Sequence, residues 1–262
     1  MTQALTSAFG RTVEEGEARL TRTWPRLFAT GAVGGIDVGM GVFGLLLVRQ
    51  ATGDEILAAL AFSIGFIALT LANSELFTEN FLVPVAAIAA GRCTIVDLLR
   101  LWSGTLLTNL VGGWVLVAFV MGGLPKLRPT AVEVARHYPQ LGIGWTSFAS
   151  AVLGGAVITL MTWMEQSTES VPAKLVAAIV AAFLLAAGAL NHAIVVSIEM
   201  FAGLQAGAPY GYLDWLGMLG WACLGNIIGG VGLVTVLRLI QVGGDVVTEA
   251  GEAAAPRRRR GR

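Results

Sequence analysis

Long apolar runs separated by short polar segments make up most of this chain. The six runs cover residues 28–48, 56–90, 98–124, 141–164, 174–203 and 213–240. A membrane-spanning helix needs about 20 predominantly apolar residues, and each run reaches that length. The pattern therefore predicts an all-α membrane protein with six transmembrane helices.

Two of the runs, 56–90 and 174–203, are too long for a simple crossing and contain polar residues near their middles. The polar residues begin at Asn73 in the first of these runs and at Asn191 in the second. Irregular backbone is tolerated at membrane depth only where it is buried in protein or lines a cavity. We therefore expect the second and fifth helices to be interrupted.

The composition is typical of a membrane protein, because 55% of the residues are hydrophobic, 13% are charged and the mean hydropathy is +0.74. The first 27 residues are polar and lack the apolar stretch of a cleaved signal peptide. We therefore expect a cytoplasmic N-terminal segment at 1–27, a transmembrane channel domain at 28–241 and a basic, disordered tail at 242–262.

Positive charges are divided unevenly between the two sides that six crossings define. With the N-terminus in the cytoplasm, the cytoplasmic segments contain 13 arginines and lysines and the opposite loops contain four. Arginine and lysine are retained on the cytoplasmic side of a membrane. We therefore expect both termini in the cytoplasm, the protein in the cell membrane, and the tail arginines near anionic lipid headgroups.

Short motifs recur between the two halves of the chain at a nearly constant spacing. The segment Asn-Leu-Val-Gly-Gly at 109–113 returns as Asn-Ile-Ile-Gly-Gly at 226–230. Three helices in each half is an odd number, so the second half would enter the membrane from the opposite side. The sequence therefore predicts two inverted three-helix repeats, at about 28–124 and about 141–240, in the plan that aquaporins also have.

The repeated motifs also predict where helices approach one another closely. An amide inside a membrane usually forms hydrogen bonds with a neighbouring helix, and glycine allows two backbones to touch. The helix-packing candidates are Asn109, Gly112, Gly113, Asn226, Gly229 and Gly230. Duplicated packing motifs without any pore would produce the same pattern.

Three polar residues within or beside the apolar runs could act on a permeating anion. His192 is the only histidine inside an apolar run, and a central proton donor would lower the barrier that a weak-acid anion meets in a dry constriction. Thr78 could donate a hydrogen bond, and Lys174 could attract anions to a pore mouth. The structural alternatives are a histidine that bridges backbone carbonyls, a threonine bonded to its own helix and an interfacial lysine.

Glu75, Glu79 and Glu199 lie within apolar runs, where carboxylates are rare and usually functional. They could serve selectivity or proton movement, and the places of Glu79 and Glu199 in the two halves suggest a symmetric pair. If ionised they would repel an anion, so a channel for a neutral solute or a cation is an alternative. No catalytic motif or metal-ligand spacing accompanies them. We therefore expect no enzyme activity, no cofactor, no metal and no nucleic-acid partner.

The stretch Asn-Ser-Glu-Leu-Phe-Thr-Glu-Asn-Phe at 73–81 resembles the signature of the formate/nitrite transporter family, whose second helix is broken by a loop close to E-L-F-T-x-N. The likeness extends over about 28–241 and includes the Asn-x-x-Gly-Gly segments, His192 and Lys174. The chain departs from the family pattern at Asn191, where glutamate is usual, and at Glu79, where a small residue is usual. These differences indicate a divergent member and leave its substrate open.

The resemblance implies a homopentamer in which each protomer has its own pore for small monovalent anions of weak acids, such as formate, nitrite or hydrosulfide. The residues that it places along this pathway are Leu76, Phe77, Thr78, Asn191, His192 and Lys174. The candidates for apolar constrictions are Phe62, Phe66 and Leu185. A structural or regulatory membrane protein that does not conduct is the remaining alternative.

Overall fold

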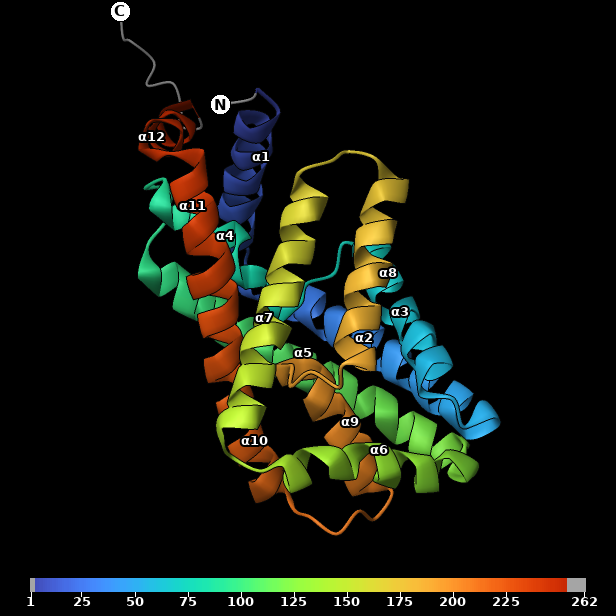
Figure 1. The fold of residues 1–262 in the computed structure, drawn as a ribbon. Helices are drawn as coiled ribbons and strands as arrows, with labels where there is room; N and C mark the ends of the chain where they lie inside the picture. Colours follow the sequence, from blue (N-terminus) through green and yellow to red (C-terminus); the bar gives the residue numbers. More distant parts are fainter. Residues whose placement is uncertain (1–2, 254–262) are drawn as a thin grey trace, which may run out of the picture.

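The computed structural model describes residues 3–253, and within that range every regular element is helical (Figure 1). Several helices are long and apolar enough to cross a membrane, which confirms the predicted all-α membrane class. These candidate spans are α2 (Trp24–Thr52), α3 (Glu55–Ala72), α5 (Ile95–Gly123), α7 (Trp145–Gln166) and the continuous helix Tyr212–Val242.

The continuous helix at the C-terminal end of the fold combines three geometries. It begins as α10 (Tyr212–Ile227), passes through a π-helical stretch, η3 (Ile228–Thr235), and ends as α11 (Val236–Val242). The Thr235 hydroxyl donates a hydrogen bond of 2.7 Å to the carbonyl oxygen of Phe81. The wider stretch thus lies against the interrupted segment of the first half.

Both of the predicted interruptions are present. After α3 the chain runs through an irregular segment into η1 (Phe77–Phe81) and α4 (Val83–Ala89). After α8 (Val171–Ala187) it is irregular again until α9 (Ala193–Gln205). Asn73 and Ala189 adopt positive φ angles of 51° and 44° at these breaks. Such a backbone conformation is uncommon for residues other than glycine, and it turns the chain out of the helix.

Regular structure also forms outside the six apolar runs. The polar N-terminal segment contains α1 (Gln3–Leu20), which buries Phe9 and Val13 against α4, α11 and α12. The loop between the halves contains η2 (Pro125–Leu127) and α6 (Arg128–Leu141). Residues 244–253 form α12 (Gly244–Ala253) instead of the expected disordered tail, because Val246 is buried against α1. The tail arginines at 257–260 and 262 lie outside the described residues.

The two ends of the molecule are covered differently. Helices α1, α4, α11 and α12 gather at the end where both termini lie, whereas α6 lies across the opposite end (Figure 1). Between these ends, α3 packs against α8 and α5 packs against α9, so the core forms where the two halves meet.

Glycines bring the helices of each half into backbone contact. A side chain on Gly35 would collide with the carbonyl oxygen of Asn109, and one on Gly155 would collide in the same way with that of Asn226. Gly112 faces the carbonyl oxygen of Ala32, and its counterpart Gly229 faces that of Val152. Gly113 and Gly230 meet the side chains of Ile198 and Phe81, which belong to the opposite halves. In both halves, therefore, glycines allow the first and third spanning helices to approach each other closely: α2 and α5 in one half, and α7 and the helix Tyr212–Val242 in the other.

Candidate permeation pathway

A buried asparagine on α5 holds the first interrupted segment in place. The Asn109 side chain donates hydrogen bonds of 2.7 Å to the carbonyl of Gly31 and of 2.8 Å to that of Glu75. Its amide oxygen accepts a bond of 2.8 Å from the N–H of Phe77. Backbone groups that lost their helical partners at the break are thus satisfied without water.

The second interrupted segment is held by the corresponding asparagine, Asn226. Its side chain donates hydrogen bonds of 2.7 Å to the carbonyl of Ala151 and of 2.9 Å to that of Asn191. Its amide oxygen accepts a bond of 2.8 Å from the N–H of Ala193. The same three bonds therefore recur in both halves of the molecule.

These bonds also define which residues of the two segments correspond. Glu75 corresponds to Asn191, because each gives its carbonyl to the scaffold asparagine, and Phe77 corresponds to Ala193. The same offset of 116 residues pairs Glu79 with Val195. Glu199 lies four residues further along α9, about one helical turn beyond that position. The expectation of a symmetric pair of carboxylates is therefore wrong.

Thr78 and His192 meet at the point where the two interrupted segments face each other. Both side chains are fully buried, and Thr78 Oγ1 lies 2.7 Å from His192 Nε2. The other ring nitrogen, Nδ1, accepts the backbone N–H of Val195 at 3.3 Å. Because Nδ1 is an acceptor, this arrangement assigns the ring proton to Nε2, which donates to Thr78. The Thr78 hydroxyl proton is then free to bond to something else.

Apolar residues close to this pair in the chain, such as Phe77 and Ile194, belong to a large buried cluster. Phe62 and Phe66 on α3 are fully buried, with ring centroids 5.6 Å apart, and Leu76 and Leu185 belong to the same cluster. Such a layer contains few groups that could replace the water around an ion.

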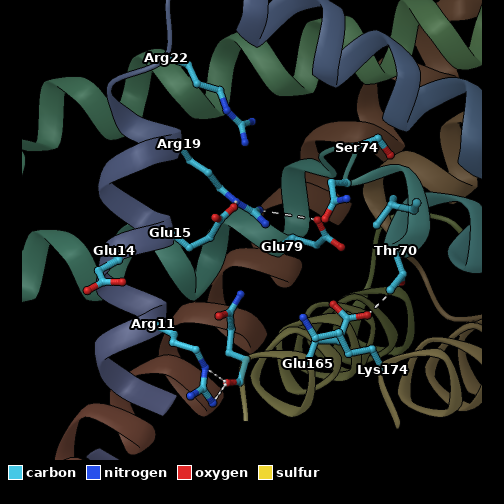
Figure 2. Close-up of a pocket in the computed structure, with 13 residues that line it drawn as sticks. Arg11, Glu14, Glu15, Arg19, Arg22, Thr70, Ser74, Glu79, Glu165 and Lys174 are labelled. Atoms are coloured by element: carbon cyan, nitrogen blue, oxygen red, sulfur yellow. Dashed lines mark hydrogen bonds and ion pairs between the residues drawn. The ribbon is translucent and has the colours of Figure 1, made fainter. Parts of the chain in front are cut away.

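A charged cavity of about 530 Å³, the α1 cavity, lies at the end where the termini gather (Figure 2). Lys174, at the start of α8, lines it together with Leu69 and Thr70 from α3. Four basic and four glutamate side chains contribute to the lining, so the formal charges balance. The charged residues are Arg11, Arg19, Arg22, Lys174, Glu14, Glu15, Glu79 and Glu165.

Arg19 of α1 and Arg22, two residues beyond the end of this helix, neutralise the carboxylates of the first interrupted segment. Arg22 forms an ion pair with Glu75, which is 2% exposed and also accepts a bond of 2.7 Å from the Asn80 amide. Arg19 lies 3.7 Å from the Glu79 carboxylate, as the dashed line in Figure 2 shows, and bonds to Asn80 at 3.2 Å. Glu79 in turn accepts the N–H of Leu76 at 3.3 Å. The N-terminal helix is thus part of the support for Thr78.

A second cavity, the α6 cavity, has a volume of about 310 Å³ and lies beneath α6. Glu199 and Tyr138 line it, and the Tyr138 hydroxyl donates a hydrogen bond to the Glu199 carboxyl. On α3, Ala59 lines the α6 cavity and Leu69 lines the α1 cavity, and Phe62 and Phe66 lie between them. Ten helical residues span about 15 Å, so the apolar layer between the two cavities is of that thickness.

Sequence reasoning missed the residues that support the site around Thr78 and His192. Arg19 and Arg22 contributed only to the count of positive charges, although Phe9, Val13 and Leu20 recur at helical spacing and could have indicated a docked helix. No local pattern around Tyr138 indicated its bond to Glu199.

The comparisons with known proteins agree with this geometry. The family model described as Formate/nitrite transporter matches residues 6–240. The chain is 26% identical to the "Inner membrane protein YfdC" of Escherichia coli, over 89% of this chain and 77% of that protein. It is 23% identical to the "Formate channel BtFdhC" of Bacillus thuringiensis, over 85% of this chain and 89% of that protein.

Solved structures share the fold. An "FNT family ion channel" superimposes with a TM-score of 0.75 at 19% identity, covering 88% of this chain and 97% of the other. A "Pentameric formate channel with formate bound" gives a TM-score of 0.69 at 22% identity, covering 84% and 98%. With a family match over most of its length, the chain belongs to the formate/nitrite transporter family.

Proposed function

We propose that this protein is a channel or transporter for small monovalent anions of weak acids, of the formate, nitrite and hydrosulfide class. The observation that carries the proposal is the buried contact between Thr78 and His192, 2.7 Å apart, where two interrupted helices meet between two cavities. A single pair of hydrogen-bonding side chains inside an apolar layer can orient a small solute that has lost most of its water.

The hydrogen bonds of His192 support a specific role for each central residue. Nδ1 accepts from Val195 and the Nε2 proton points to Thr78, so the neutral ring has no second proton to lend. His192 therefore orients Thr78, and the Thr78 hydroxyl donates a hydrogen bond to the passing solute. Lys174 adds a long-range attraction for anions that offsets the repulsion by the glutamates of the α1 cavity.

The assembly and its orientation are part of the same proposal. We expect a homopentamer in the cell membrane, by analogy with the solved pentameric formate channel of the same fold. Six crossings in two inverted repeats, with both termini in the cytoplasm, would open the α1 cavity to the cytoplasm and the α6 cavity to the outside.

A channel for a cation or a neutral solute is less well supported. The carboxylates nearest the centre, Glu75 and Glu79, are matched by Arg22 and Arg19, so they do not present a net negative charge to the pathway. Glu199 lies one helical turn beyond the second segment and has no arginine or lysine within ion-pair distance among the described residues.

The experiment uses liposomes that contain the purified full chain and a pH-sensitive dye. External formate, nitrite, hydrosulfide and acetate are added in turn, and we expect a rapid change of internal pH with at least one of them. His192→Ala should lower the initial rate by about tenfold or more, because Thr78 loses its orienting partner. Ser103→Ala, which removes an exposed hydroxyl bonded only to its own helix, is the control.

Two results would count against the proposal. No acid-linked flux with any of the four anions would contradict the function. A His192→Ala variant that conducts as fast as the parent would contradict the central role of the pair.

A further inference from the structure

Three glutamates that line the two cavities have no ion-pair partner among the described residues: Glu14, Glu165 and Glu199. Glu14 is exposed and Glu165 is half-buried, so Glu199 is the one that is buried. It is 4% exposed, lies on α9 among apolar side chains and reaches the α6 cavity. Glu75 and Glu79 each have an arginine partner, and Glu55 and Glu133 share Arg49 at 2.8 and 3.0 Å. Among residues 3–253, no arginine or lysine lies within ion-pair distance of Glu199.

The hydrogen bonds around Glu199 engage only one of its oxygens. Tyr138 donates to Oε2, and burial, followed by the charge of Glu199, raises the pKa of the Tyr138 hydroxyl, so that group remains a donor. Tyr210 donates instead to the carbonyl of Met200 at 2.8 Å. Oε1 is left with no hydrogen-bond partner in the described part of the chain, and it belongs to a residue that lines the cavity.

The other charged and titratable groups that face Glu199 come from several helices. Arg49 of α2, Glu55 of α3, and Glu133 and His137 of α6 line the same cavity. With His137 neutral and Glu199 ionised, one arginine faces three glutamates, so the cavity would be formally negative. An anion would be repelled from this end unless it met a proton there.

We infer that Glu199 is a proton donor to weak-acid anions in the α6 cavity, and this inference rests on the proposed function. The O–H bond of the Glu199 carboxyl breaks, the proton bonds to the anion, and the neutral acid moves into the apolar layer. The carboxylate left behind takes a proton from water in the α6 cavity. A neutral acid crosses about 15 Å of apolar surroundings at a far lower free-energy cost than an anion.

The sequence suggested that His192 both binds the solute at the centre and supplies its proton, and this assignment gives the two tasks to different residues. The neutral His192 orients Thr78 at the centre, and Glu199, seven residues along the chain, supplies the proton before the solute enters the apolar layer. Tyr138 positions the carboxyl but exchanges no proton.

The test compares three variants in dye-loaded liposomes, with the acid that the parent conducts fastest. Glu199→Gln keeps the volume and an acceptor for Tyr138 but has no acidic proton. We expect its proton-linked influx to fall by about tenfold or more and to lose its dependence on external pH between mildly acidic and neutral conditions. Glu199→Asp should retain a pH-dependent influx. Tyr138→Phe should slow influx but preserve its pH dependence.

The outcomes distinguish this inference from the proposed function. A Glu199→Gln variant that matches the parent in rate and pH profile overturns the inference alone, and so does a Glu199→Asp variant without pH dependence. Equal losses in Glu199→Gln and Tyr138→Phe, with the pH profile kept in both, would show that Glu199 only braces α6. No acid flux in the parent overturns both. If Glu199→Gln fails to fold, the pH profile of Glu199→Asp decides.

Discussion

The two interrupted segments share one scaffold but are stabilised by different means. Asn109 and Asn226 make the same three hydrogen bonds to their respective segments. The first segment also contains Glu75 and Glu79, which are neutralised by Arg22, just beyond α1, and by Arg19 of α1. The second segment has the neutral Asn191 at the position of Glu75, and its N–H bonds to the Ser150 hydroxyl at 2.9 Å.

This difference shows where a buried carboxylate can be accommodated. A helix with arginines docks at the end of the first segment, so a charge there has a partner. Helix α6, which packs against α9 beyond the second segment, contains Arg128 and Arg136, but neither forms an ion pair among the described residues. The residue that corresponds to Glu75 carries no charge. An unpaired charge in an apolar interior is strongly destabilising, whereas an amide can be satisfied by neutral groups.

The largest expected effect comes from removing the ion pair between Arg22 and Glu75. Arg22→Ala leaves Glu75 buried without its cation and should lower the free energy of unfolding by about 2–4 kcal/mol. Thermal unfolding in detergent measures this loss. The double variant Arg22→Ala with Glu75→Gln should recover most of it, because the stranded charge is gone. A double variant no more stable than the single one would show that the ion pair is not the cause.

The shared scaffold should be almost as sensitive, and equally so in both halves. Asn109→Ala and Asn226→Ala each strand backbone groups at a break and should cost about 2 kcal/mol of unfolding free energy. The same thermal unfolding measurement applies, with Thr108→Ala, a part-buried hydroxyl bonded to its own helix, as the control. A large loss of unfolding free energy in only one of these two variants would show that the two asparagines contribute unequally to stability.

The meeting point of the two segments should affect flux more than stability. Thr78→Val keeps the shape but removes the hydroxyl between His192 and the solute, and should slow flux by about tenfold, or ~1.4 kcal/mol in the barrier. Thr78→Ser, which keeps the hydroxyl, should remain close to the parent. Liposome influx rates measure both. Equal rates for serine and valine would exclude the hydroxyl as a functional donor.

The smallest expected effect concerns the cation that the second half contributes to the α1 cavity. Lys174→Ala should slow flux by about threefold at low ionic strength, and the difference should vanish in high salt because salt screens the long-range attraction. Lys174→Arg should match the parent at both salt concentrations. A defect in Lys174→Ala that persists in high salt would indicate a contact with the solute instead of long-range attraction.

The pattern of apolar runs by itself determined the class of fold and the places where helices break. Polar residues that begin at Asn73 and Asn191 interrupt apolar segments that are too long for one crossing. The sequence alone is enough to recognise these interruptions. The repeated Asn-x-x-Gly-Gly motif likewise identified the scaffold residues, because glycine and a buried amide have few other uses in a membrane. The sequence also placed Thr78 and His192 at these breaks, but it assigned proton transfer to His192, whereas the hydrogen bonds of the ring indicate that it orients Thr78.

Only the tertiary structure decided how the charges in the pathway are balanced. The Arg22–Glu75 contact joins residues 53 positions apart, and the Tyr138–Glu199 contact joins residues 61 positions apart. Such pairs depend on how α1 and α6 dock, and a polar helix can face water, lipid headgroups or another helix with the same sequence. The assignment of Glu79 to the α1 cavity and Glu199 to the α6 cavity arose in the same way. Local spacing determines where a helix breaks, whereas packing determines which charge has a partner.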